Sequence, residues 1–425
     1  MRYANRILNG WRQYDRFTES LYGRYESKTI QYISFCRNLY VAFLEFKRTS
    51  EILEFGYFMI LLLRSIIYHF CFNPILSDKA KVVIIEVNAS QDSELAAHAG
   101  ISLVRIEWKF DSAREILSKI RIFFEWILCA RLLLLGNDLK KFYSFKTLPE
   151  LLLGINLYNR IDLSGIEKIV TQRDRYPEEI GILKKAKELG IKTFKFDHFL
   201  ALGTVNQNRI FCEYYLYPNQ INASHFKKFE ANKDIKYYEV GFPYWDAFAK
   251  FRWKPERNPK IITFFSQYGN SLGIFGPKGP YFYIQEILET IDDSFLLLVK
   301  PHPIELKNGF PTFKSNRIQI VDGKTVSNPE LISKSCFVLS LASQALIEAK
   351  HINPQSAYIN YEPEHSLDWD YSLLNGKLEL IRSRKELREF LYEKKDFISC
   401  EEFIDFFHPS FPNSLEKITK AIHSI

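Results

Sequence analysis

The chain has 425 residues, of which 47% are hydrophobic and 25% charged, so it is long enough for two or three globular domains with sizeable cores. Its formal net charge is +7 without a dense run of lysine and arginine, which argues against a nucleic-acid-binding arm and favours anionic small molecules or an anionic membrane. The six cysteines are scattered without a Cys-x-x-Cys pair, which favours free thiols in a reducing compartment and argues against a cysteine–histidine metal site.

Residues 1–80 predict a helical segment that is rich in tyrosine, phenylalanine and leucine and carries more basic than acidic residues. No apolar signal core follows its basic start, and the apolar stretches at residues 57–72 and 123–135 are shorter than the roughly 20 residues of a spanning helix. The sequence therefore predicts a cytoplasmic protein. Because a basic, aromatic helix can rest on anionic lipid, peripheral contact with the inner face of the cytoplasmic membrane is a further hypothesis. Its alternative is a helical appendage packed on the first domain.

From residue 81 the pattern changes to short apolar runs that alternate with helical periodicity. Strands are expected at residues 81–87, 101–106, 168–171, 192–196, 213–217 and 237–240. Helices are expected at residues 90–100, from residue 111 through 135, at 177–190 and up to residue 229. Alternating strands and helices predict a parallel sheet, so residues 81–250 are assigned to a first Rossmann-like domain.

Residues 251–259, with two prolines and several charges, indicate a linker to a second series of elements. Strands are expected at residues 261–265, 295–300, 318–321, 337–340 and 357–359, with a helix at 281–290 and further helices between the later strands. Residues 251–425 therefore form a second Rossmann-like domain. The expected fold class is α/β, with two Rossmann-like domains that face a cleft and a helical segment before them.

Two apolar runs of the second domain end abruptly in polar residues. The strand at 295–300 ends in Lys300 and delivers His302 between two prolines, and the strand at 337–340 leads from Ser340 to Ser343 at the start of a helix. Ligands of open α/β sheets bind at the carboxyl ends of strands, and hydroxyls at a helix N-terminus suit a phosphate. This pattern predicts a nucleotide or nucleotide-sugar site. The alternatives are a histidine that caps a strand and a serine that caps a helix.

Three further positions carry weaker signals. Gly269, in the loop after the strand at 261–265, lets the backbone come close to a donor. Arg173 and Arg175 follow the strand at 168–171 and suit an acidic acceptor or a carboxylate of the donor, although a solvated loop explains them equally well. The sequence has no Asp-x-Asp motif in a credible site, no Walker loop, no nucleophile elbow and no dinucleotide fingerprint, so neither a metal nor a cofactor is expected.

The order of four features resembles the GT-B glycosyltransferases of bacterial surface-polysaccharide synthesis, over roughly residues 80–400. These features are Phe196-Asp197-His198, the junction Gly241-Phe-Pro-Tyr-Trp-Asp246, Lys300-Pro-His-Pro303 and the helix start Ser340-x-x-Ser343. The families that this order resembles most are the capsule polysialyltransferases, the lipooligosaccharide sialyltransferases and the capsular Kdo transferases. The glycerophosphotransferases of teichoic acid synthesis look more distant.

The resemblance implies roles for residues of the second domain. His302, with Lys300 beside it, contacts the donor phosphate and assists departure of the leaving group, because an imidazole N–H stabilises the negative charge that develops there. Ser340 and Ser343 bind the donor phosphate. Glu348 accepts hydrogen bonds from the ribose hydroxyls.

The resemblance also places the general base at Asp197 or His198. Related enzymes carry an acidic pair followed by glycine, or a His-Gly, at this strand end. Because the Asp-His-Phe of this chain departs from both patterns, the identity of the base stays open between the two residues, and a structural Asp-His pair is the alternative. Asp246 is expected to cap the helix after the junction.

The implied function is a metal-independent glycosyltransferase that moves a sugar from a nucleotide donor to a glycan or lipid-linked glycan of the bacterial surface. The first domain would bind the acceptor and the second the nucleotide-sugar donor, and a CMP-activated acidic sugar such as sialic acid or Kdo is the specific expectation. The alternatives are a transferase of polyol phosphate from a CDP-linked donor, a UDP-sugar 2-epimerase, and an inactive glycan-binding subunit of a capsule or lipopolysaccharide assembly complex.

Overall fold

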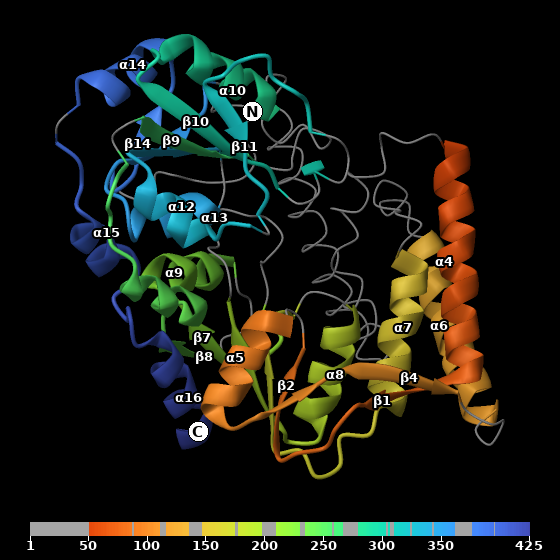
Figure 1. Ribbon diagram of the computed structural model, residues 1–425. Helices are drawn as coiled ribbons and strands as arrows, with labels where there is room; N and C mark the ends of the chain where they lie inside the picture. The colour runs from red at the N-terminus through yellow and green to blue at the C-terminus, as the bar shows by residue number, and fades with distance from the viewer. Residues whose placement is uncertain are drawn as a thin grey trace.

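The computed structural model of the chain describes residues 51–86, 89–110, 116–135, 147–174, 177–197, 210–229, 234–256, 259–266, 279–302, 305–306, 310–323, 325–341, 344–361, 376–394 and 396–425. Within these residues the chain builds two six-stranded sheets, one in each half of the molecule in Figure 1, and one two-stranded sheet. All neighbouring strands in both six-stranded sheets run parallel. The α/β class and the two Rossmann-like sheets predicted from the sequence are confirmed.

The first sheet has the strand order β3-β2-β5-β6-β7-β8. Its strands are β2 (Val82–Ile85), β3 (Ser102–Val104), β5 (Lys168–Thr171), β6 (Lys192–Phe196), β7 (Tyr214–Tyr217) and β8 (Lys236–Glu239). Helix α5 (Ala89–Ala99) packs on one face, and residues of α7 (Thr147–Arg160), α8 (Pro177–Glu188) and α9 (Gln220–Phe229) pack on the other. Burial on both faces explains why these strands are nearly continuous apolar runs.

The second sheet has the strand order β11-β10-β9-β12-β13-β14. Its strands are β9 (Lys260–Phe265), β10 (Phe295–Lys300), β11 (Ile318–Ile320), β12 (Phe337–Ser340), β13 (Ser356–Ile359) and β14 (Glu379–Ile381), of which β14 was not predicted. The helices of this half are α10 (Gly279–Thr290), α12 (Asn328–Lys334), α13 (Gln344–Lys350), α14 (Arg384–Tyr392) and α15 (Cys400–Phe407). One large apolar cluster joins them to the sheet.

A helical subdomain flanks the first sheet and includes an antiparallel pair that the sequence did not predict. The pair is β1 (Phe72–Leu76) with β4 (Ile106–Phe110), so the strand expected at 101–106 is divided between β3 and β4. Helices α4 (Glu51–Cys71) and α6 (Ile116–Leu135) pack with α7 beside this pair (Figure 1). Of the expected segment 1–80, residues 1–50 lie outside the described residues. No helix within the described residues combines the length and apolar character needed to cross a bilayer.

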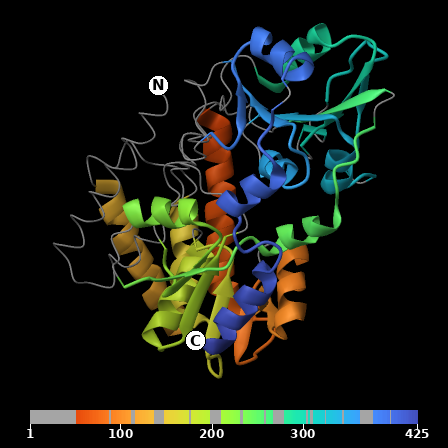
Figure 2. The ribbon, with the colours of Figure 1, turned by 90° about the vertical axis from the view of Figure 1, so that its left-hand side faces the viewer.

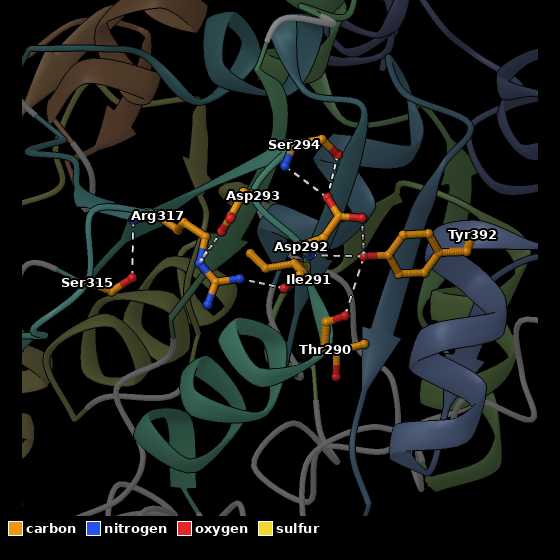
Figure 3. Close-up of polar contacts among 8 residues, drawn as sticks. All are labelled: Thr290, Ile291, Asp292, Asp293, Ser294, Ser315, Arg317 and Tyr392. Carbon is orange, nitrogen blue, oxygen red and sulfur yellow. Dashed lines mark hydrogen bonds and ion pairs between the residues drawn. The ribbon is translucent and has the colours of Figure 1, made fainter.

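The amino-terminal edge of the second sheet is held by local polar contacts (Figure 3). Asp292, in the turn before β10, accepts hydrogen bonds from the Ser294 backbone N–H at 2.8 Å and hydroxyl at 2.5 Å, while the Tyr392 hydroxyl lies 3.2 Å from its other oxygen. Arg317, just before β11, donates to the Ile291 carbonyl. These contacts hold the turn before β10 and the start of β11 in place. Ligands of open α/β sheets bind at the opposite, carboxyl-terminal edge.

The two halves are joined by η3 (Pro243–Lys250), a 3₁₀ segment that follows β8. Gly241, just before it, has a φ of +86°, and a Cβ at this position would lie 2.3 Å from the Ser414 hydroxyl oxygen and 2.7 Å from His408 Nε2. Only glycine fits this combination of backbone angle and close approach. The junction motif is therefore required for the fold, whatever its part in the chemistry.

The C-terminal helix α16 (Ser414–Ser424) returns from the second half to the first. Its Ile418 and Ile422 join the apolar cluster of α5 and the first sheet, and α16 lies beside α5 in both ribbon views (Figures 1 and 2). Asp246 in η3 accepts a hydrogen bond from the Leu415 backbone N–H at 2.9 Å. Asp246 thus caps a helix, but the helix is α16 and not the one after the junction, because the chain crosses back after residue 408.

Candidate functional site

The topology of the second sheet places a switch point between β9 and β12. Counted along the chain from β9, its strand order is 3-2-1-4-5-6. The chain therefore runs from β9 through β10 to β11 on one side, and then crosses to β12, β13 and β14 on the other side. Ligands of open α/β sheets bind outside the carboxyl ends of the strands at such a point. Ser266 follows β9, Lys300 ends β10 and Ser340 ends β12, so the fold brings the predicted donor residues to one edge.

His302 lies at this edge and is half-buried. Glu305 links His302 to the end of the neighbouring strand β9. Its two carboxylate oxygens accept hydrogen bonds from the His302 backbone N–H at 2.8 Å and from the Ser266 hydroxyl at 2.9 Å. Burial lowers the pKa of His302 below its usual 6.5, although Glu305 opposes the shift. The imidazole is therefore neutral at pH 7. Ser266 and Glu305 were not predicted from the sequence, since only the strand pairing brings them together.

Lys300 belongs to a polar chain that leads to Glu348. Its ammonium donates to Asn328 Oδ1 at 2.6 Å and to the Val326 carbonyl at 3.1 Å, and Asn328 Nδ2 donates to Glu348 Oε2 at 3.0 Å. Burial raises the pKa of Glu348, against the effects of Asn328 and Lys300. Burial also lowers the pKa of Lys300. Lys300 and Glu348 are thus brought into one network, through an asparagine that the sequence analysis missed.

Ser340 is fully buried, and its hydroxyl donates to the Phe265 carbonyl on β9 at 3.0 Å. The hydroxyl proton of Ser340 is therefore engaged in a hydrogen bond inside the sheet, and toward a ligand this hydroxyl can act only as an acceptor. Ser343 and Gly269 lie outside the described residues. The phosphate-binding roles of both serines and the role of Gly269 stay predictions.

Asp197 directly follows β6 and is fully buried, at 0% exposure. One carboxylate oxygen accepts hydrogen bonds from the Tyr215 hydroxyl and from Asn222 Nδ2 at 3.3 Å. The other oxygen has no hydrogen-bond partner among the residues that the structure describes. It lies 3.6 Å from the Lys195 ammonium, which is 3.0 Å from Asp174. Burial raises the pKa of Asp197, and Lys195 is the strongest opposing influence.

The buried surroundings of Asp197 thus leave one oxygen that can accept a proton. His198, the second candidate for the base, lies outside the described residues, and so does Arg175. Arg173 is paired with Glu179 at 3.1 Å. The base and the arginine roles stay predictions.

Two buried histidines hold the crossing of the chain between the halves. His408 Nε2 accepts from the Phe242 backbone N–H at 3.0 Å and lies 2.7 Å from the Ser414 hydroxyl. His408 Nδ1 lies 3.2 Å from His351 Nε2, and His351 Nδ1 lies 2.8 Å from the Ile347 carbonyl. These partners place the single proton of each ring on Nδ1, so both rings are neutral.

Acidification is therefore expected to destabilise this junction. Burial lowers the pKa of His351 to about 4 and that of His408 well below its usual 6.5. Between pH 6.5 and 4 the unfolded chain binds protons that the folded chain does not, so stability is lost as pH falls through this window. His351 alone should cost on the order of 2 kcal/mol at pH 5.

The pH prediction is checked by thermal unfolding of wild type and His351→Gln at about pH 7.5 and about pH 5. Glutamine cannot be protonated, so the variant should lose less stability on acidification, even if it starts less stable. Equal losses in both proteins would contradict the assignment, since carboxylates elsewhere contribute equally to the two.

Comparisons with known proteins give structural neighbours only. No protein-family model matches the chain, and no curated protein matches it. UDP-GlcNAc 2-epimerase from Methanocaldococcus jannaschii is similar at 14% identity and TM-score 0.48, over 82% of this chain and 100% of that chain. UDP-GlcNAc 2-epimerase from Neisseria meningitidis is similar at 10% identity and TM-score 0.47, over 81% of this chain and 99% of that chain.

The wall teichoic acid polymerase TagF is similar at 13% identity and TM-score 0.42, over 64% of this chain and 74% of that chain. These neighbours are two epimerases and a polymerase, and none of the three is a sialyltransferase or Kdo transferase. At such identities and TM-scores the likeness carries no conclusion about activity. The α/β fold of this chain is established by its own two sheets.

Proposed function

We propose that the chain is a metal-independent glycosyltransferase that takes a sugar from a nucleotide donor. A CMP-activated acidic sugar, such as sialic acid or Kdo, is the proposed donor, and a surface glycan or lipid-linked glycan is the acceptor. The observation that carries the proposal is the position of His302, half-buried and neutral, at the carboxyl edge of the second sheet beside its switch point.

The proposed chemistry at His302 is stabilisation of the leaving nucleotide. Negative charge develops on the nucleotide phosphate as the glycosidic bond breaks, and a fixed imidazole N–H stabilises it more than water does. Glu305 fixes the backbone of His302 and ties it to Ser266, so the backbone that carries the ring is held in place. Lys300 supplies positive charge on the preceding strand end.

The proposed base in the first half is Asp197. Its raised pKa, and the oxygen that has no hydrogen-bond partner within the described part of the chain, suit acceptance of the proton from an acceptor hydroxyl. The acceptor oxygen would then attack the sugar, and the nucleotide would leave beside His302. His198 remains the second candidate.

A donor panel tests the function. The purified chain is incubated with CMP-sialic acid, CMP-Kdo, a CDP-linked polyol and UDP-GlcNAc, with and without EDTA, and nucleotide release and epimerisation are measured. We expect release of CMP that persists in EDTA. Turnover of the CDP-polyol alone would assign a phosphotransferase, and epimerised UDP-GlcNAc an epimerase. No turnover of any donor, together with glycan binding in a separate binding assay, would assign an inactive subunit. Strict dependence on Mg²⁺ or Mn²⁺ would contradict the metal-independent mechanism.

We also propose peripheral contact with an anionic membrane, at the inner face of the cytoplasmic membrane where a lipid-linked acceptor would lie. Support comes from an exposed apolar face on α4 and α6. Leu63 on α4 is 59% exposed, and Leu117 and Phe124 on α6 are 80% and 60% exposed. Other exposed members of this α4–α6 face are Met59, Ile60, Ile67, Ile116, Ile120, Ile127 and Leu128. Protruding apolar helices with arginines beside them suit shallow insertion into anionic lipid.

Flotation with anionic liposomes tests this contact. We expect binding at low salt that weakens as salt rises, and that is largely lost in Leu117→Glu combined with Phe124→Glu. Leu189→Glu is the matched control, because Leu189 is 57% exposed but lies outside the α4–α6 face. Charge reversal at Arg2, Arg6, Arg12 and Arg16, which lie outside the described residues, tests the basic start of the chain.

Two results would contradict the membrane proposal. One is a wild-type protein that does not float with liposomes at low salt. The other is a double variant that floats normally but sediments with a lower mass than wild type, which would assign the face to contact between two copies of the chain.

A further inference from the structure

Tyr244 lies at the junction of the two halves, on a segment whose backbone is fixed on both sides. Its neighbours Phe242 and Trp245 are fully buried, and Asp246 accepts a hydrogen bond from the Leu415 backbone N–H of α16. The Tyr244 ring packs edge-on against Trp245, with 5.6 Å between ring centroids. The position of the Tyr244 side chain is therefore set by the fold and not by a mobile loop.

The Tyr244 hydroxyl is connected to the donor half of the site. It accepts a hydrogen bond from the side-chain amide of Gln344, the first residue of α13. This helix start follows β12 beside the switch point. Among the residues that the structure describes, the Tyr244 hydroxyl has this donor but no acceptor for its own proton, so the proton is available to a ligand.

Charged groups from both halves influence the pKa of the Tyr244 hydroxyl. Burial is the largest cause of the raised pKa of Tyr244, followed by the nearby charge of Glu348 on α13, and Asp197 at the end of β6 acts in the same direction. The phenol therefore stays protonated at neutral pH and acts as a hydrogen-bond donor. The pKa of this phenol thus responds both to the residue proposed to hold the donor and to the residue proposed to act as base.

We propose that Tyr244 is a substrate-contacting residue that donates a hydrogen bond to a hydroxyl group of the bound donor, while Glu348 accepts a hydrogen bond from that same hydroxyl. A hydroxyl group can both accept and donate, which suits a position between a phenol and a carboxylate. A phosphate only accepts hydrogen bonds and is repelled by both carboxylates. The inference rests on the proposed function, since it takes the ligand to be a nucleotide sugar.

Two parts of such a donor carry hydroxyl groups, the ribose and the transferred sugar, and calorimetry separates them. Wild type and Tyr244→Phe are titrated with the nucleotide that the wild type binds among CMP, CDP and UDP, and with its 2′,3′-dideoxy analogue. If the contact is to ribose, the variant should bind the nucleotide about 5- to 10-fold more weakly and the dideoxy analogue as well as wild type does. If it is to the sugar, nucleotide affinity is unchanged and KM for the nucleotide sugar rises by a similar factor.

The control is Tyr392→Phe, which removes a hydrogen-bonded phenol at the opposite edge of the same sheet (Figure 3) and should change neither affinity nor KM. A folded Tyr244→Phe protein with wild-type nucleotide affinity and wild-type KM would overturn the inference and leave the proposed function intact. Equal weakening toward the nucleotide and its dideoxy analogue would also overturn it, because the effect would then be structural. A wild type that binds no nucleotide would overturn both proposals.

Discussion

Replacing His302 by alanine is expected to lower turnover about 100-fold or more on the donor that the panel identifies. The variant loses the N–H that stabilises charge on the leaving nucleotide. The contact with Glu305 should persist, because Glu305 binds the backbone N–H of residue 302 and not its ring. The effect should appear mainly in kcat, since the stabilised charge develops only in the transition state.

Single-turnover assays with wild type, His302→Ala and His98→Ala measure this effect. His98 is exposed on α5, away from the second sheet, so its substitution serves as a control for loss of a surface imidazole. Wild-type turnover in His302→Ala would remove this residue from the mechanism. A drop in melting temperature that matches the loss of turnover would show that the change acts through the fold.

Replacing Asp197 by asparagine is expected to lower transfer about 100- to 10,000-fold while nucleotide affinity changes little. An amide oxygen can still accept from Tyr215, so the change keeps volume and hydrogen bonding but removes the proton acceptor. Burial would make the raised pKa of Asp197 visible as the acidic limb of the pH–rate profile of the wild type.

Asp174→Asn is the matched control for Asp197→Asn. Asp174 shares the Lys195 ammonium with Asp197 and is equally buried, so loss of the ion cluster as such should affect both variants alike. A far larger effect at Asp197 would identify it as the base. If the larger effect appears in His198→Gln, the base is the histidine, and if neither change slows transfer, it lies elsewhere in the chain.

The sequence by itself determined most strands of the two parallel sheets, because strands buried on both faces consist of short apolar runs with sharp polar ends. It did not indicate β14 or the pair of β1 with β4. The strands at 168–171, 192–196 and 295–300 were predicted with the bounds that the structure has, as were the alternation with helices and the division into two sheets. The polar ends of β6, β10 and β12 were visible for the same reason, and they supplied Asp197, His302 and Ser340 as candidates.

Only the tertiary structure decided how these strand ends meet. Strand order placed β9 between β10 and β12, and so paired Ser266 with His302 through Glu305. It also turned the Ser340 hydroxyl toward the Phe265 carbonyl inside the sheet. Contacts of this kind join residues tens of positions apart, and no local pattern in the chain records them.

The return of α16 is the clearest case. Its amphipathic sequence shows that one face must be buried, but not that the partner is α5 of the first half, more than 300 residues earlier. The same packing sets Asp246 as a cap of α16 and leaves Tyr244 between the two halves. Hydrophobic attraction has no preferred direction, so it does not by itself select the partner of an apolar helix face. The shape of the folded chain determines which two apolar faces pack together.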